Sequence, residues 1–144
     1  MFEAVGEDNW DTYFKTIHDR LVPGGTAVLQ IITIDSERFH SYRKNADFIQ
    51  RYIFPGGMLP SQEALQGAIS RNNLILQDTH FFGSSYARTC ALWNERFQSA
   101  WPKIESLGYS MRFKRMWEYY LSYCEAGFKA GSINVGLFKI AKTT

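Results

Sequence analysis

The stretch that decides the fold is Tyr52-Ile-Phe-Pro-Gly-Gly-Met-Leu-Pro-Ser61. Its two prolines fix φ and remove backbone donors, whereas its paired glycines permit positive φ. Ser61 is a suitable helix cap, and Glu63 falls in the first turn that would follow. The pattern predicts a rigid turn between two helices. This turn carries three apolar side chains, which composition alone places in a buried core and which could instead line a ligand site: Phe54, Met58 and Leu59.

Composition indicates a folded globular protein. The chain has 144 residues, 45% of them hydrophobic and 16% aromatic, and a net charge of only +2, which does not indicate a nucleic-acid partner. No apolar run is long enough for a membrane span, and no signal-peptide pattern is present. Arg112, Lys114 and Arg115 form a small basic cluster that could contact an anionic headgroup or simply be a solvated helix face. Cys90 and Cys124 are predicted to be small core residues of a reducing compartment.

A helix and a strand are predicted before this turn. Residues 8–21 place apolar side chains at spacings of three and four, and Asp8 is a suitable N-cap. Pro23-Gly24-Gly25 is predicted to end the helix. Residues 26–34 follow as a nearly continuous apolar run, which predicts a strand covered on both faces.

Periodicity predicts the remaining elements. Residues 35–52 carry weak apolar markers and predict one helix or a broken one. Gly83-Ser84-Ser85 predicts a turn and cap, Pro102 a kink or restart, and Gly131 a helix stop. Helices are further predicted over 62–71, 86–106 and 111–130, and strands over 74–82 and 133–141. Three strands interleaved with helices predict an α/β fold.

Three motifs carry a resemblance to a known family. They are Phe2-Glu3-Ala4-Val5-Gly6, the stretch 52–61, and Arg115-Met-Trp-Glu-Tyr-Tyr-Leu121. In this order the chain resembles the C-terminal half of cyclopropane-fatty-acyl-phospholipid synthases and the related mycolic acid cyclopropane synthases. The resemblance implies the C-terminal half of a class I S-adenosylmethionine-dependent methyltransferase fold, which is Rossmann-like, with the last strand inserted antiparallel between the other two. Residues 1–144 would then be a single partial domain, the acyl-substrate half.

The same resemblance implies an activity. Family members transfer a methylene group from S-adenosylmethionine to the cis double bond of unsaturated acyl chains of phospholipids, and bound bicarbonate takes the released proton. The family's glycine-rich cofactor loop has no counterpart in this sequence, because Pro23-Gly24-Gly25 lies before a strand and not between a strand and a helix. The chain alone is therefore expected to be inactive and not to bind the cofactor tightly. A longer parent would be cytoplasmic, peripheral to the inner membrane and homo-oligomeric.

Four residues match the bicarbonate site of the family. Glu3 matches a glutamate, Ile32 a position whose backbone binds the anion, and Tyr120 a tyrosine that donates to it. Gln30 stands where most relatives have a histidine, so it can donate a hydrogen bond but cannot act as an acid or base. Without the family, Glu3 would be a frayed surface acid, Gln30 a buried core amide, and Tyr120 a core tyrosine.

The resemblance also assigns an acyl-binding set and leaves rival functions open. The predicted substrate-binding residues are Phe54, Met58, Leu59, Tyr86 and Trp117. His18, His40 and His80 lack partners at metal-ligand spacing and are predicted to be surface or turn residues, so no metal is expected. One alternative is a related methyltransferase acting on another lipid or a small molecule. Another is a non-catalytic lipid-binding or interaction fragment.

Overall fold

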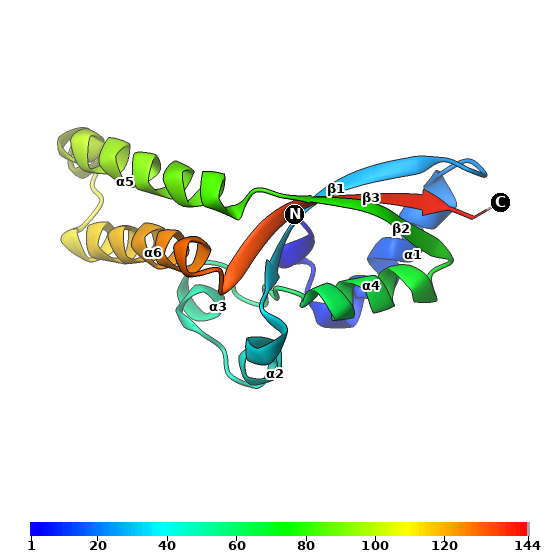
Figure 1. Ribbon diagram of the computed structural model, residues 1–144. Helices are drawn as coiled ribbons and strands as arrows, with labels where there is room; N and C mark the ends of the chain where they lie inside the picture. Colours follow the sequence, from blue (N-terminus) through cyan, green and yellow to red (C-terminus); the bar gives the residue numbers. More distant parts are fainter. Residues whose placement is uncertain (144) are drawn as a thin grey trace. The chain divides into compact units, whose positions relative to one another are not determined.

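The computed structural model describes residues 1–143, which form two compact units. One comprises residues 1–82 and the chain from Ile133 onward, and the other comprises Gly83–Ser132. Each unit is built from its own secondary structure (Figure 1). The assignment of residues 1–144 to a single partial domain stays a prediction.

The first unit contains a three-stranded sheet. Its strands are β1 (Thr26–Ile34), β2 (Leu74–Phe81) and β3 (Ile133–Lys142), in the order β1-β3-β2. β3 is antiparallel to both neighbours, so the predicted insertion of the last strand between the other two is confirmed. Gly136 pairs with Ile31 on one side and Phe81 on the other. A Cβ at Gly136 would lie 2.9 Å from the Phe81 ring, so only glycine fits there.

Six helical segments accompany the sheet. They are η1 (Phe2–Ala4), η2 (Glu7–Asn9), α1 (Trp10–Arg20), α2 (Ser36–Lys44), α3 (Phe48–Tyr52) and α4 (Gln62–Arg71). The prediction that Asp8 caps the first helix is wrong, because a 3₁₀ turn precedes α1 and its N-cap, Asn9, makes no side-chain capping bond. The predicted helix over 35–52 is broken, because the Asp47 side chain caps α3 in a capping box with Gln50. Ser61 caps α4 as predicted.

One face of the sheet covers the core of this unit. The prediction that β1 is covered on both faces is wrong among the described residues, because Thr26, Val28 and Gln30 are exposed while the alternate positions turn inward. Val28 is 59% exposed. The fully buried core side chains include Phe2, Phe14, Ile31, Leu65, Ile69, Phe138 and Ile140.

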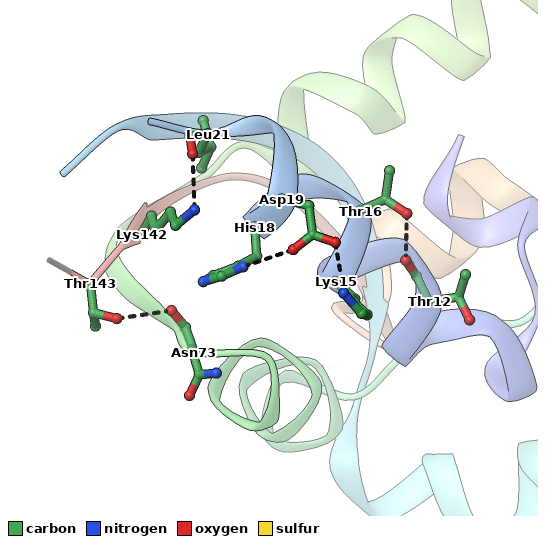
Figure 2. A network of polar contacts seen from close by, with 9 residues as sticks. All are labelled: Thr12, Lys15, Thr16, His18, Asp19, Leu21, Asn73, Lys142 and Thr143. Carbon is green, nitrogen blue, oxygen red and sulfur yellow. Dashed lines mark hydrogen bonds and ion pairs between the residues drawn. The ribbon is translucent and has the colours of Figure 1, made fainter. Parts of the chain in front are cut away.

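Figure 2 shows how the end of α1 is tied to the end of β3. Nζ of Lys142 donates to the Leu21 carbonyl at 3.1 Å, and its peptide N–H donates to the Gly25 carbonyl at 2.9 Å. Asp19 lies in the last turns of α1 and contacts Lys15 and His18. Hydrogen bonding from Lys15, and then from His18, lowers the pKa of the Asp19 carboxyl.

The second unit is a helical hairpin. α5 (Gly83–Ser106) and α6 (Met111–Ala130) run antiparallel, since Tyr86 packs on Phe128 near one end of the pair and Phe97 faces Phe113 near the other. The predicted turn at 83–85 is instead the first turn of α5, and Pro102 lies inside the helix rather than restarting it. Gly131 ends α6 in the left-handed conformation at φ 70°, as predicted.

Candidate functional site

A hydrogen bond joins the start of the chain to β1. The peptide N–H of Ile32 donates to Oε1 of Glu3 over 2.7 Å. The Glu3 side chain is 23% exposed, and its second oxygen accepts from the amino group of Met1 at 3.0 Å. The structure thus brings together two of the four residues predicted for the bicarbonate site, and the interpretation of Glu3 as a frayed surface acid is wrong.

Aromatic packing fixes the short helix that carries Glu3. Phe2 is only 1% exposed. Its ring lies 5.4 Å from the ring of Trp10, 5.1 Å from that of Tyr13 and 5.4 Å from that of Phe14. Because Phe2 is anchored in the core, its neighbour Glu3 is directed toward the backbone of β1. Burial, and then the negative charge of Glu3, raise the pKa of the Tyr13 hydroxyl.

The Pro-Gly-Gly stretch holds Glu3 from a second side. The Met58 N–H donates to the Glu3 carbonyl at 2.8 Å, and the Ile34 N–H donates to the Pro60 carbonyl at 2.9 Å. A Cβ on Gly57 would lie 3.0 Å from the Phe54 carbonyl oxygen and 3.3 Å from that of Glu3. Glycine at this position therefore permits the close approach of the loop to the glutamate.

An open hollow of about 570 Å³ adjoins this loop. Arg43 and Glu7 form an ion pair of 2.7 Å in its wall. Among the predicted acyl-binding residues, Met58 lines the hollow and is also part of the core, Leu59 packs partly buried against the core, and Phe54 is 52% exposed. The loop is thus partly in the core and partly on the surface. Neither of the two interpretations, a buried core or a ligand site, describes Phe54, Met58 and Leu59 together.

Gln30 does not occupy the buried position that was expected for it. It lies on the exposed face of β1, opposite Leu137 of β3, because side chains alternate along a strand and Ile31 takes the core side. The interpretation of Gln30 as a core amide is wrong. Its role toward an anion stays a prediction.

Tyr120 lies in the second unit together with Tyr86 and Trp117. Burial is the main cause that raises the pKa of the Tyr120 hydroxyl to about 12, followed by the charges of Cys124, Cys90 and Tyr86. A side-chain hydrogen bond links Tyr120 to Cys124, and the rings of Trp117 and Tyr120 lie 5.4 Å apart. The hydroxyl therefore stays protonated well above neutral pH and is able to donate a hydrogen bond.

Two residues near Glu3 were missed from the sequence. The negative charge of Glu3 contributes to the raised pKa of the Tyr13 hydroxyl. The helical spacing of Tyr13 does not distinguish it from a core residue. Gln50 donates to the Gly57 carbonyl at 3.0 Å and so supports the loop. The spacing Asp47-x-x-Gln50 is that of a capping box and would have predicted the position of Gln50.

Within residues 1–143 there is no cluster of three or more His, Cys, Asp or Glu side chains that could hold a metal ion. In the same range no helix is both long and apolar enough to cross a bilayer. The two cysteines are free, with Cys90 buried and Cys124 partly buried.

Solved structures place this fold in a class. The mycolic acid cyclopropane synthase CmaA1, solved with SAH and CTAB, superposes with a TM-score of 0.87 at 27% identity over 98% of this chain and 52% of that one. A putative sarcosine dimethylglycine methyltransferase from Galdieria sulphuraria, at 14% identity, a TM-score of 0.71 and coverage of 93% of this chain and 48% of that one, shares the fold alone. The fold is thus that of part of a class I methyltransferase.

Sequence comparison gives the family. A sequence model of mycolic acid cyclopropane synthetases matches residues 1–138, and the chain belongs to this family. The cyclopropane-fatty-acyl-phospholipid synthase of Escherichia coli K12 is 42% identical over 136 residues, which are 94% of this chain and 34% of that protein. The tuberculostearic acid methyltransferase UfaA1 of Mycobacterium tuberculosis is 40% identical over 94% of this chain and 32% of its own length. The chain therefore spans about a third of these curated relatives.

Proposed function

We propose that the chain is the C-terminal, acyl-substrate part of an S-adenosylmethionine-dependent cyclopropane-fatty-acyl-phospholipid synthase. The observation that carries the proposal is the 2.7 Å hydrogen bond between Ile32 and Glu3, because it joins two family site positions 29 residues apart. The 42% identity to the Escherichia coli synthase supports a phospholipid acyl chain as substrate. The whole protein would work in the cytoplasm, as a homo-oligomer at the surface of the inner membrane.

The residues of this chain do not fit S-adenosylmethionine by themselves. β1 leads into α2 through Asp35, and β2 leads into α5 through Phe82, so neither of these strand-to-helix junctions is glycine-rich. The cofactor would be held by residues outside this chain.

Bicarbonate would bind Glu3 in one orientation. The Ile32 N–H already donates to Oε1 of Glu3, so this carboxylate would accept from the hydroxyl group of bicarbonate through Oε2, the oxygen that also contacts the Met1 amino group. Gln30 and Tyr120 would donate to the anionic oxygens, Tyr120 because its high pKa keeps it protonated. Bound bicarbonate would supply the base for proton removal. Gln30 has no proton-transfer capacity, so its part is limited to holding the anion.

The residues proposed to bind the acyl chain are apolar or aromatic. Met58 and Leu59 present a partly buried apolar surface on the loop, and Phe54 extends from it. Tyr86 and Trp117 lie in the second unit, where their aromatic faces would favour a cationic intermediate. These five residues are the proposed substrate-binding set.

A second candidate product follows from the comparisons. UfaA1, named as a methyltransferase of tuberculostearic acid, is nearly as similar to this chain as the Escherichia coli synthase is. A methyl-branching reaction on the same class of acyl chain, or methyl transfer to another lipid or small molecule, is therefore the alternative. A non-catalytic lipid-binding fragment is the further alternative of a different class.

A chimera tests the proposal. We would replace the matching third of the Escherichia coli synthase with this chain and incubate it with S-adenosylmethionine and vesicles of unsaturated phospholipid. Mass spectrometry of the released fatty acids should show a cyclopropane product. A methyl-branched product would support the alternative reaction. A chimera that melts cooperatively and binds the cofactor, yet modifies no lipid, would refute the catalytic proposal and favour the lipid-binding alternative.

A further inference from the structure

The turn between α5 and α6 exposes large apolar side chains. Leu107 is 70% exposed, Tyr109 48% and Met111 47%. They stand at alternate positions over five residues and are flanked by Lys103 and by the arginines at the start of α6. We call this set the hairpin tip: Lys103, Leu107, Tyr109, Met111, Arg112 and Arg115.

Local structure holds the hairpin tip in place. The Leu107 and Gly108 N–H groups donate to carbonyls in the last turn of α5, and Gly108 adopts φ 93°. The Ser110 hydroxyl caps α6 by accepting from the Phe113 N–H at 3.3 Å. The Tyr109 ring lies 4.6 Å from that of Phe113. The apolar side chains are therefore presented by an ordered turn.

The hairpin tip is predominantly positively charged. From Lys103 to Arg115 the sequence contains four basic residues and one acidic residue, Glu105. The Lys114 ammonium group already has partners within the hairpin, since it pairs with Glu118 at 3.6 Å and lies over the Trp101 ring. Lys103, Arg112 and Arg115 are exposed. Within residues 1–143 these three make no side-chain hydrogen bond or ion pair.

The flanking cations lie close to the apolar side chains along the chain. Arg115 follows Met111 by four residues on α6, and residues at this spacing are neighbours on a helix surface, while Lys103 lies in the last turn of α5, just before Leu107. Apolar side chains beside free cations are the combination that partitions into the headgroup region of an anionic bilayer. Tyrosine is also favoured at that depth.

We propose that the hairpin tip binds the surface of membranes that contain anionic phospholipid, with Leu107, Tyr109 and Met111 inserted among the acyl chains and Lys103, Arg112 and Arg115 on the headgroups. The proposal stands on exposure and charge and is independent of the transferase reaction. It assigns lipid-surface contact to a specific part of the second unit.

Vesicle sedimentation tests this assignment. The 144-residue chain is mixed with vesicles of 30% saturated phosphatidylglycerol and 70% saturated phosphatidylcholine, without S-adenosylmethionine, so failure of the enzymatic proposal would not affect the result. Binding should be strong at low salt, fall as salt rises, and be weak to pure phosphatidylcholine. Replacing Arg112 and Arg115 by Gln should lower the partition coefficient on the order of tenfold, because each basic residue near such a surface contributes to binding.

Matched control variants distinguish binding by the hairpin tip from binding caused by positive charge or exposed apolar surface elsewhere on the chain. Arg88→Gln with Arg96→Gln removes the same charge from exposed positions of α5. Tyr123→Ser removes a tyrosine that is 42% exposed, close to the 48% of Tyr109. Tyr109→Ser should weaken binding and Tyr123→Ser should not. Equal loss in tip and control variants, or no binding of the unmodified chain to anionic vesicles, would overturn the proposal.

Discussion

The N–H of Ile32 donates to Oε1 of Glu3 at 2.7 Å, although 29 residues separate them. The Glu3 carbonyl simultaneously accepts from the Met58 N–H at 2.8 Å. Glu3 is therefore held through both its side chain and its main chain, by β1 on one side and the Pro-Gly-Gly loop on the other. A carboxylate fixed in this way is held in one orientation and would need little rearrangement to bind a ligand.

The bond to Ile32 should be measurable in stability. Glu3→Ala leaves the Ile32 N–H without its acceptor, and because the site is only partly buried we expect a loss of about 1–2 kcal/mol in the free energy of unfolding. Glu3→Gln keeps an acceptor without the charge and should lose less. Urea unfolding measures both.

Glu7→Gln is the control for the Glu3 variants. Glu7 pairs with Arg43 at 2.7 Å on the surface, and such pairs contribute little, about 0–1 kcal/mol. If Glu3→Ala and Glu7→Gln lower the free energy of unfolding equally, the hydrogen bond from Ile32 contributes no more to stability than a surface ion pair does.

The chain should not bind S-adenosylmethionine specifically, because its strand-to-helix junctions provide no glycine-rich loop. Titration calorimetry with cofactor at about 1 mM covers the range in which enzymes usually bind their substrates. The chimera described above serves as the positive control. Saturable one-to-one heat with the 144-residue chain alone would contradict the prediction.

The chain should self-associate through β1. This strand is at one edge of the sheet within the described residues, and Val28 on it is 59% exposed. A long apolar edge strand is a template for pairing, and a lysine on it discourages pairing. Light scattering at micromolar concentration should show a dimer or larger species, and Val28→Lys should shift it toward monomer.

Ile75→Lys distinguishes the two sheet edges. Ile75 is 53% exposed on β2, the strand at the opposite edge. The association predicted for β1 should survive this change. Loss of association with Ile75→Lys but not with Val28→Lys would assign the contact to β2 instead.

The extent of each strand and helix was largely predictable where sequence signals are local. β1 and α4 have the predicted bounds, because a Pro-Gly-Gly stop precedes one and the Ser61 cap begins the other. The failures depend on neighbours that a local pattern does not encode. Val28 is apolar and Gln30 lies within a nearly continuous apolar run, which predicts burial, yet no described layer covers that face of β1. Periodicity predicts a strand, and only packing decides which of its faces are covered.

The candidate site was predictable only in part and for a similar reason. The resemblance named Glu3 and Ile32, but their contact depends on the burial of Phe2 among three aromatic rings, which no spacing rule indicates. The hydrogen bond between Tyr120 and Cys124 joins positions one helical turn apart. This pair could have been proposed from the sequence, since residues at that spacing are neighbours on a helix.

The pKa of Tyr120 should make stability depend on pH in the alkaline range. Its folded value of about 12 lies above the usual value of 10, so the folded chain retains a proton that the unfolded chain loses. The stabilising contribution is fully present below pH 10 and is lost as the pH rises from 10 to about 12. Urea midpoints should therefore fall over this window, and less steeply for Tyr120→Phe than for the unmodified chain. Identical slopes would contradict the assignment.

Removing the Tyr120 hydroxyl distinguishes a role in the reaction from a role in the fold alone. Tyr120→Phe keeps the ring that packs on Trp117 and removes the hydroxyl that bonds to Cys124. If the hydroxyl is purely structural, its removal should cost about 1 kcal/mol and leave turnover unchanged. If it holds the anion that takes the proton, kcat of the chimera should fall by about 10²-fold or more, as for other positioned donors.

Two measurements on the chimera separate these roles. The rate of lipid modification on unsaturated vesicles reports on catalysis, and urea unfolding reports on stability. Tyr119→Phe is the matched control, because Tyr119 is the adjacent residue on α6 but is 53% exposed and stacks on Tyr123. We expect Tyr120→Phe to lose turnover far beyond its loss of stability, while Tyr119→Phe keeps both, because the Tyr120 hydroxyl is partly buried and Tyr119 is exposed. Equal turnover of Tyr120→Phe and the unmodified chimera would remove Tyr120 from the site and leave it as a structural partner of Cys124.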